Sequence, residues 1–267
     1  MPRLRDIDLR THLADPASKQ AFVTPMFDLI ASRYDAFTRL FSFGMDRRWK
    51  SLVLSELCAR VPPGARVIDV ACGTGDLALA AWAALAGATV TGIDAAASMV
   101  ALARARALGI EAPGVEFLVG DLMHLPVTDG SADAVTAGYA FRNVPDHKSA
   151  LAEVARALRA GGVLVTLDFY RPQSPAWRVL FLGYLRAAGN IVGWWWHREP
   201  VAYGYIAPSI DSFVSSEQFT EDLRTAGFTV RAVHAFLRRG VAIHVATRDD
   251  REAAEISADR ALRVTRA

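Results

Sequence analysis

Cysteine is scarce in this sequence and long apolar runs are missing, and each absence excludes a class of protein. Only two of the 267 residues are cysteines, Cys58 and Cys72, and their spacing matches no metal-binding motif. We therefore expect neither a disulfide framework nor a metal site, and a cytoplasmic, reducing location. No apolar stretch reaches the roughly 18 residues of a membrane span, and the first turns of the chain lack the apolar core of a secretory signal.

An excess of one charge is also missing. The chain carries 30 basic and 28 acidic residues, for a net charge of +2, whereas a nucleic-acid-binding protein normally presents a clustered basic face. Nucleic acid is therefore not an expected partner. Hydrophobic residues make up 52% of the chain, which is enough for the core of one large α/β domain with a lid.

Strand and helix patterns alternate through the middle of the chain. Residues 20–60 show helical spacing of apolar residues and end at Pro62-Pro63-Gly64. Strand-like runs follow at residues 66–70, 89–94, 115–119, 134–137 and 163–169, and helical runs at residues 77–85, 98–108 and 150–158. The last helix is expected to be closed by Gly161-Gly162. This alternation predicts a mostly parallel sheet with helices on both faces.

Residues 172–220 interrupt the alternation with several tyrosines, Trp177 and the run Trp194-Trp195-Trp196, which predicts a helical lid insertion. Two strand-like runs then surround Arg239-Gly240 and predict an antiparallel closing hairpin. This is the Rossmann-like α/β layout of class I methyltransferases. The expected parts are an N-terminal helical cap (1–60), a cofactor-binding core (61–171), the lid (172–220), the closing strands (221–248) and a charged tail (249–267).

The turn after the first strand, Asp69 to Asp76, is a candidate cofactor loop with Gly73, Thr74 and Gly75 at its centre. Glycine permits a tight turn and a close ligand approach, and ligands of open α/β sheets bind beyond the carboxyl ends of the strands. The loop alone also fits a dinucleotide loosely. Cys72 within it is interpreted as a small buried residue rather than a nucleophile.

Two acids distinguish the cofactors. Asp94 ends the second strand, where a carboxylate can accept both hydroxyl hydrogens of a ribose, which suits NAD and S-adenosylmethionine equally. Asp121 follows the third strand and can accept from an adenine amino group, with the Leu122 N–H available to a ring nitrogen. Acids after both strands favour S-adenosylmethionine; a solvated strand end and a helix N-cap are the alternatives. Met99 and Gly138 complete the expected cofactor site.

A further set of motifs covers roughly residues 20–247. The matching segments are residues 26–35, 40–44, Trp49-Lys50, 67–77, Leu125-Pro126, 141–144, 158–162, 226–228 and 240–242. In these the chain resembles the ubiquinone/menaquinone biosynthesis C-methyltransferase family. Tyr34-Asp35 and Arg142-Asn143-Val144 are specific to that family. The resemblance implies a quinone-like acceptor, cofactor contacts at Thr74, Asp94, Asp121 and Leu122, and catalytic roles near Tyr34, Arg142 and Asn143.

The chain departs from this family mainly around the expected acceptor. Thr38 stands where the family usually has Asn, Gly138 to Phe141 replace Ser-Phe-Gly-Leu, and Leu167 to Tyr170 replace Leu-Glu-Phe-Ser. The lid has the triple tryptophan and lacks the proline that the family has near Asn190. All but the change at Thr38 lie beside the expected substrate pocket or in the lid, so the identity of the acceptor stays open.

Ring-carbon methylation needs an aligned, electron-rich acceptor. Arginine is a poor base, so we expect Arg142 to stabilise a phenolate, Asn143 to bind a ring oxygen and Tyr34 to close over the cofactor. An ion pair, a turn and core packing are the respective structural alternatives. Asp168 is another candidate to face the substrate, and the alternative bases are His124, His147, His197, His234 and His244.

The leading interpretation is therefore an S-adenosylmethionine-dependent enzyme that C-methylates a quinol ring of the demethylmenaquinol or ubiquinol-precursor type. The alternatives are a C- or O-methyltransferase of another aromatic acceptor, a non-catalytic assembly protein and an NAD-dependent oxidoreductase, the last disfavoured by Asp121 and the closing hairpin. Three interpretations of the run Trp194 to Trp196 stay open: its side chains line a pocket, they fill the core of the lid, or they make peripheral contact with a membrane. The sequence does not determine the oligomeric state, and a homodimer is one option.

Overall fold

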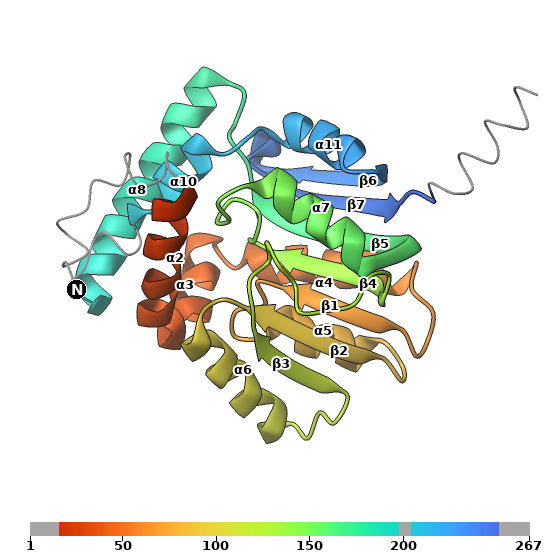
Figure 1. Ribbon diagram of the computed structural model, residues 1–267. Helices are drawn as coiled ribbons and strands as arrows, with labels where there is room; N and C mark the ends of the chain where they lie inside the picture. Colours follow the sequence, from red (N-terminus) through yellow and green to blue (C-terminus); the bar gives the residue numbers. More distant parts are fainter. Residues whose placement is uncertain (1–15, 198–203, 251–267) are drawn as a thin grey trace, which may run out of the picture.

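The computed structural model describes residues 16–197 and 204–250, and it contains one seven-stranded sheet (Figure 1). The strands lie in the order β3-β2-β1-β4-β5-β7-β6. Their bounds are β1 Arg66–Val70, β2 Thr89–Asp94, β3 Val115–Val119, β4 Ala132–Gly138, β5 Leu158–Phe169, β6 Phe228–Phe236 and β7 Val241–Arg248. The expected tail falls almost entirely outside the described residues.

The first five strands pair in parallel, and β7 pairs antiparallel with both β5 and β6. This confirms the mostly parallel sheet and the closing antiparallel hairpin predicted from the sequence. The strand order reverses direction between β1 and β4, and in open α/β sheets such a point opens a crevice at the carboxyl ends of the strands. The fold therefore provides a ligand site beyond Val70 and Gly138.

Helices cover both faces of the sheet, as the alternation predicts. The helices are α2 Pro16–Ile30, α3 Tyr34–Phe41, α4 Met45–Cys58, α5 Asp76–Ala84, α6 Ala97–Gly109, α7 His147–Ala157, α8 Pro175–His197, α10 Ile206–Ser212 and α11 Ser216–Thr225, with short 3-10 turns at Ala31–Arg33 and Leu237–Arg239. One core cluster joins α4, α5 and α6 to the sheet, and another joins α7 and α11 to its opposite face.

The end of α7 differs from the sequence prediction. The helix ends at Ala157, and Leu158 already belongs to β5, so Gly161-Gly162 lies in a strand and does not close the helix. The pairing of β4 with β5 shifts register between Ala132 and Ala134. A Cβ on Gly162 would lie 2.9 Å from the Arg159 carbonyl oxygen, so the glycine permits this irregular strand start rather than a helix cap.

A layer of helices closes the carboxyl end of the sheet. Side chains of α2, α8 and α10 pack together there, including Met26, Phe181, Leu185, Tyr205 and Ile210. Figure 1 shows α2 and α3 beside α8 and α10, at the side of the sheet where the parallel strands end. Segments far apart in the sequence therefore form one cap over the ligand crevice. In the described part of the chain, no helix is long and apolar enough to cross a membrane.

Candidate active site

A deep cleft lies at the carboxyl ends of β1, β2 and β4 and encloses about 1030 Å³ of space, part of it open to solvent. All but one of the predicted cofactor-binding residues line it: Asp69, Gly73, Thr74, Asp94, Met99, Asp121, Leu122 and Gly138. Gly75 alone is absent from the lining. The sequence thus predicted which strand ends and which loop face this cleft.

Gly73 and Gly75 both have positive φ angles, +55° and +84°, but they serve different contacts. A Cβ on Gly73 would meet nothing within 4 Å, so its missing side chain leaves space at the cleft. A Cβ on Gly75 would lie 2.7 Å from Cζ of Phe117. Gly75 therefore allows α5 to begin tightly against the sheet, and its expected role as a ligand contact stays a prediction.

Asp94 is held rigidly at the end of β2. Its Oδ2 accepts the Gly73 N–H and its Oδ1 accepts the Ala96 N–H, both at 2.8 Å. Burial raises the pKa of Asp94, and the two backbone hydrogen bonds oppose that shift. Each carboxylate oxygen has more than one lone pair, so this fixed carboxylate can accept further hydrogen bonds from a ligand.

The other two predicted acids, Asp69 and Asp121, also line the cleft. Asp69 is buried at its floor, where Oδ1 accepts from the Thr136 hydroxyl at 2.7 Å. Burial raises the pKa of Asp69 to about 7, against the opposing effect of hydrogen bonds from Thr136 and Ala78. Asp121 lies in a turn and accepts the Met123 N–H at 2.9 Å. No helix begins at Asp121 in the described chain, so the N-cap alternative is not realised.

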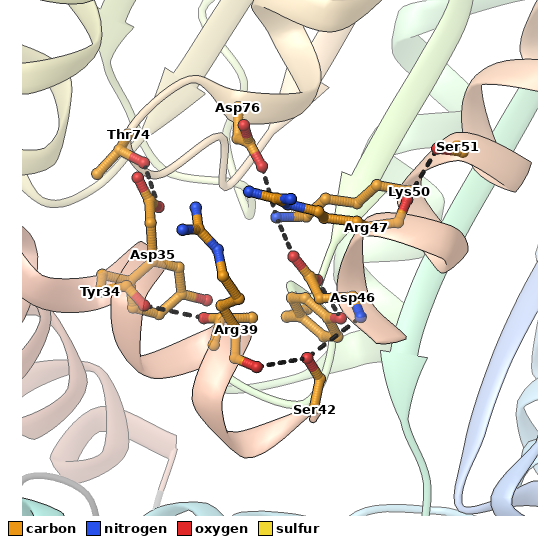
Figure 2. Close-up of polar contacts among 12 residues, drawn as sticks. Tyr34, Asp35, Arg39, Ser42, Asp46, Arg47, Lys50, Ser51, Thr74 and Asp76 are labelled. Atoms are coloured by element: carbon orange, nitrogen blue, oxygen red, sulfur yellow. Dashed lines mark hydrogen bonds and ion pairs between the residues drawn. The ribbon is translucent and has the colours of Figure 1, made fainter. Parts of the chain in front are cut away.

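The cleft is strongly acidic. Five carboxyl groups line it, those of Asp35, Asp69, Asp76, Asp94 and Asp121, whereas Lys50 is the only lysine or arginine among the described lining residues. Lys50 Nζ lies between two carboxylates, 2.9 Å from Asp46 and 2.7 Å from Asp76 (Figure 2). Burial opposes the shift, yet these two acids raise the pKa of Lys50. Such a cleft suits a ligand that carries positive charge.

The N-terminal helices are tied to the glycine loop. Asp35, the second residue of α3, accepts from the Thr74 hydroxyl at 2.8 Å (Figure 2). It also forms an ion pair with Arg106. The preceding residue, Tyr34, packs edge-on against Phe27 with ring centroids 5.7 Å apart. Tyr34 lines the cleft and also a second pocket behind it. It is therefore placed to close over the cleft, as the sequence predicts.

The second pocket is smaller, about 540 Å³, and mainly apolar. It shares a wall with the cleft, because Phe27, Tyr34 and Tyr139 line both. Its remaining lining residues come from the helical cap and the ends of β4 and β5: Met26, Ile30, Thr38, Phe41, Arg142, Phe169, Leu185, Tyr205 and Ile206. No described carboxylate, lysine or histidine lines this pocket, so a buried aromatic ligand would meet hydroxyl groups and one guanidinium.

Arg142 supplies that guanidinium and is only 5% exposed. Its Nη1 lies 3.6 Å from Oδ1 of Asp168 and donates to the Tyr139 carbonyl at 3.2 Å. The guanidinium also lies over the rings of Phe169 and Tyr139, at 5.6 and 5.9 Å from their centroids. Among the described residues no acceptor satisfies its buried Nε. Arg142 thus combines the structural ion pair with a position in the pocket wall.

Asp168 lies behind Arg142 rather than in the pocket. Its carboxylate is fully buried and accepts the backbone N–H groups of Arg142 and Phe169. Burial raises the pKa of Asp168, and the nearby Arg142 opposes the shift. The interpretation that Asp168 faces the substrate does not hold, because its oxygens are used to hold the end of β4 and the guanidinium.

Asn143 faces the cleft instead of the second pocket. Its Nδ2 donates to the Tyr139 carbonyl at 2.8 Å, and its Oδ1 accepts from the Tyr205 hydroxyl at 3.3 Å. The side chain therefore joins the end of β4 to the helical cap. This geometry makes Asn143 a positioning residue, and its expected hydrogen bond to a ring oxygen stays a prediction.

The alternative bases lie elsewhere. His147 pairs with Asp222 at 2.8 Å, His234 pairs with Glu56 at 2.7 Å, and His244 is buried beside Tyr170. The side chain of His124 is 88% exposed. His197, like Trp195 and Trp196, has a side chain outside the described set. Trp194 is 68% exposed and lines neither pocket. The interpretation that this tryptophan lines an aromatic pocket is therefore wrong.

Sequence reasoning missed several residues of the site. The sequence marks Tyr139 only as a residue that differs from the family pattern. In the structure its ring lines both pockets, and its hydroxyl donates to Asp46 at 2.7 Å. Lys50 was noted only within a matching segment. Lys19 was missed altogether: its Nζ donates to the Val144 carbonyl at 2.7 Å, and burial, with Arg142 nearby, lowers its pKa to about 8. No local pattern marks Lys19, because its partner is distant in the sequence.

Comparisons with known proteins agree with this geometry. A family model described as the ubiE/COQ5 methyltransferase family matches residues 15–248. Demethylmenaquinone methyltransferase of Thermus thermophilus is 40% identical over 84% of this chain and 100% of its own length. The ubiquinone/menaquinone biosynthesis C-methyltransferase UbiE of Desulfotalea psychrophila is 35% identical over 85% of this chain and 90% of its own length. These matches confirm the resemblance found in the motifs.

Solved structures share the fold at lower identity. A SAM-dependent methyltransferase from Aquifex aeolicus matches with a TM-score of 0.57 and 17% identity, over 82% of this chain and 97% of its own. At that identity the likeness concerns the fold, and it confirms the class I methyltransferase arrangement expected from the order of strands and helices.

Proposed function

Because the chain belongs to the ubiE/COQ5 methyltransferase family and is an S-adenosylmethionine-dependent methyltransferase, we propose that it methylates a ring carbon of an isoprenoid quinol. The observation that carries this proposal is that an acidic cleft and an apolar pocket adjoin each other, because Phe27, Tyr34 and Tyr139 line both. A donor and an aromatic acceptor can approach each other there while the helical cap excludes water. The names of the relatives support a demethylmenaquinol-type acceptor.

The cleft has the chemistry to hold the methyl donor. S-adenosylmethionine supplies a methyl group on a positively charged sulfur, and the excess of carboxylates matches a ligand with sulfonium and ammonium groups. We assign the ribose hydroxyls to Asp94 and the adenine amino group to Asp121. Lys50 is the cation available to a ligand carboxylate. The open space beside Gly73 lets the ligand approach the backbone.

The second pocket has the chemistry to activate a phenol. Its one charged side chain, Arg142, stays protonated, so it stabilises a phenolate oxygen rather than removing the proton. Charge on that oxygen makes the ortho carbon more nucleophilic. Asp168 holds the guanidinium in place, and the unsatisfied Nε supports a role for a ligand oxygen. The hydroxyl groups of Tyr34 and Tyr205 offer further hydrogen bonds.

A second candidate acceptor is another aromatic compound, methylated on carbon or oxygen. The tyrosine at position 139 favours it, because this wall residue is phenylalanine in most of the family that the motifs resemble. We further propose that the protein is located in the cytoplasm, that it makes peripheral contact with a membrane, and that it forms a homodimer.

Two substitutions test the assignment of the two pockets. Asp94→Ala removes an acceptor of charge-assisted hydrogen bonds, each worth about 1.5–3 kcal/mol, so donor binding should weaken roughly 100-fold or more in calorimetry. Arg142→Ala should leave donor binding intact and lower turnover of a short-chain demethylmenaquinol on the order of 100-fold.

Arg231→Ala, an exposed arginine on β6, is the matched control and should change neither quantity. Normal turnover by Arg142→Ala would show that the phenolate is stabilised elsewhere. Unchanged donor binding by Asp94→Ala would show that the cleft is not the donor site.

A further inference from the structure

Helix α8 is apolar on its outer side as well as its inner side. Phe181, Leu185 and Val192 face inward and are buried against the cap. The opposite face carries Leu180, Tyr184, Ile191 and Trp194, which are 63%, 36%, 68% and 68% exposed. Their spacing places them on one side of the helix. A surface helix normally turns a polar face to water, so this exposed stripe requires an explanation.

The turn between α3 and α4 extends the stripe. Phe43 is 73% exposed, and its ring stacks on Tyr184 with centroids 5.3 Å apart. Its φ angle is +50°, a left-handed conformation that is unfavourable for a bulky side chain. Leu40, 51% exposed, lies one turn earlier. The outer apolar face, defined as Leu40, Phe43, Leu180, Tyr184, Ile191 and Trp194, therefore includes an aromatic ring presented outward despite local strain.

The exposed charges in the two segments that carry the outer apolar face have one sign. Between Tyr34 and Lys50, and along α8 up to Trp194, the exposed charged side chains are Arg39, Arg47, Arg48 and Arg186. The two acids in these segments are Asp35 and Asp46, which are paired with Arg106 and Lys50. Figure 2 shows Arg39 and Arg47 directed toward the cleft, whereas Arg186 is exposed on α8 itself. Exposed basic residues on the elements that carry an aromatic and aliphatic face complement an anionic lipid surface, where Trp and Tyr also prefer to lie.

Helices α3 and α8, which carry residues of the outer apolar face, also contribute to the lining of the second pocket. Leu185 of α8 and both Thr38 and Phe41 of α3 line that pocket, and they neighbour Tyr184 and Leu40 in the chain. Figure 1 shows α8 along the outside of the molecule, beside the helices of the cap. Two of the elements that line this pocket, α3 and α8, are thus also elements that carry exposed apolar residues.

We propose that the outer apolar face docks on the surface of a bilayer containing anionic phospholipid, and that acceptor enters the second pocket from that side. The entry route rests on the proposed function, because only a lipid-soluble acceptor needs it. The docking itself rests on the exposed residues and the flanking arginines.

Vesicle flotation of the full chain tests the docking. We expect binding to vesicles of phosphatidylglycerol and phosphatidylethanolamine, and weaker binding to vesicles of phosphatidylcholine alone. Replacing Tyr184 and Trp194 together by serine should lower binding on the order of tenfold or more, since both rings leave the interface. Leu108→Ser is the matched control, because Leu108 is 80% exposed on α6, outside the outer apolar face. Both substitutions are at exposed positions, and unchanged circular dichroism verifies that the variants fold.

Methyl-transfer assays separate this inference from the proposed function. The Tyr184→Ser, Trp194→Ser double variant should methylate a short-chain, water-soluble quinol as the unmodified protein does, and lose rate only on a long-chain quinol in vesicles. Absence of vesicle binding by an active enzyme would overturn the docking and leave the function intact. A dimer in sedimentation that the double variant disrupts, without vesicle binding, would assign the face to a second copy. Vesicle binding without methylation of any quinol would support the docking and overturn the function.

Discussion

Among single residues, Tyr139 is central to the site because it lines both the cleft and the second pocket. Its hydroxyl donates to Asp46, whose other oxygen pairs with Lys50 in the donor cleft. Its ring stacks on Phe169 with centroids 5.3 Å apart, beneath the guanidinium of Arg142. Burial and the nearby Asp46 raise the pKa of Tyr139 well above its usual value, so the hydroxyl stays a proton donor. One side chain thus connects the polar cleft to the apolar pocket.

Tyr139→Phe isolates the hydroxyl of this residue. A buried hydrogen bond to a charged group contributes about 1.5–3 kcal/mol, so the free energy of unfolding in urea should fall by about that amount. The ring still fits, because the related family usually has phenylalanine there. Tyr184→Phe, at an exposed tyrosine, should change stability by less than about 0.5 kcal/mol. Equal stability of Tyr139→Phe and the unmodified protein would contradict a structural role for the Asp46 contact.

Residues that follow a recognisable strand could be predicted from the sequence, whereas residues paired across the fold could not. Asp94 and Asp121 lie at strand ends, where the chain pattern marks the ligand edge of the sheet. Tyr139 and Asp46 are separated by 93 positions, and no local pattern links a tyrosine after β4 to an acid in α4. The close approach of Phe117 to Gly75 could not be predicted either, because the two residues lie on separate elements.

At the scale of elements, close approach between α5, β2 and β3 shapes the floor of the cleft. Phe117 of β3 packs against Gly75 and Gly92, and a Cβ on Gly92 would lie 2.4 Å from its Cδ1. The loop that carries Thr74 therefore depends on small residues beneath it.

Gly92→Ala should disturb this packing. Overpacking a close-packed core costs about 1–3 kcal/mol, so thermal unfolding should occur at a lower temperature and donor affinity should fall as the loop shifts. Gly109→Ala, at the end of α6 with nothing within 4 Å, is the control and should be neutral or slightly stabilising. A neutral Gly92→Ala would mean that Phe117 can move without disturbing the loop.

The predicted bounds of a strand agree with those in the structure wherever clear turn residues flank the strand. β1, β2 and β3 have the predicted bounds. The boundary between α7 and β5 was wrong because a glycine pair after a helical run is also compatible with an irregular strand start, and only the pairing of Ala132 with Leu158 distinguishes them.

At the scale of the whole molecule, the strand-and-helix alternation predicted the sheet, but not the acceptor pocket. That pocket forms where Met26, Phe41, Leu185 and Tyr205 from four separate helices meet the end of the sheet. Tertiary packing of the cap decides its shape, and the amphipathic pattern of each helix carries no information about its partner. The lining of the cleft was therefore largely predictable residue by residue, and that of the second pocket only as a region.

We propose that the methyl group passes directly from a donor in the acidic cleft to a ring carbon held in the adjoining apolar pocket, beside Tyr34 and Tyr139. The most direct measurement is to incubate the purified protein with S-adenosylmethionine carrying a carbon-13 methyl group and with reduced membrane quinones, and to locate the label by NMR. The account predicts label in a methyl group bonded to a ring carbon of a quinol. Label on oxygen, or only on another aromatic compound, would contradict it.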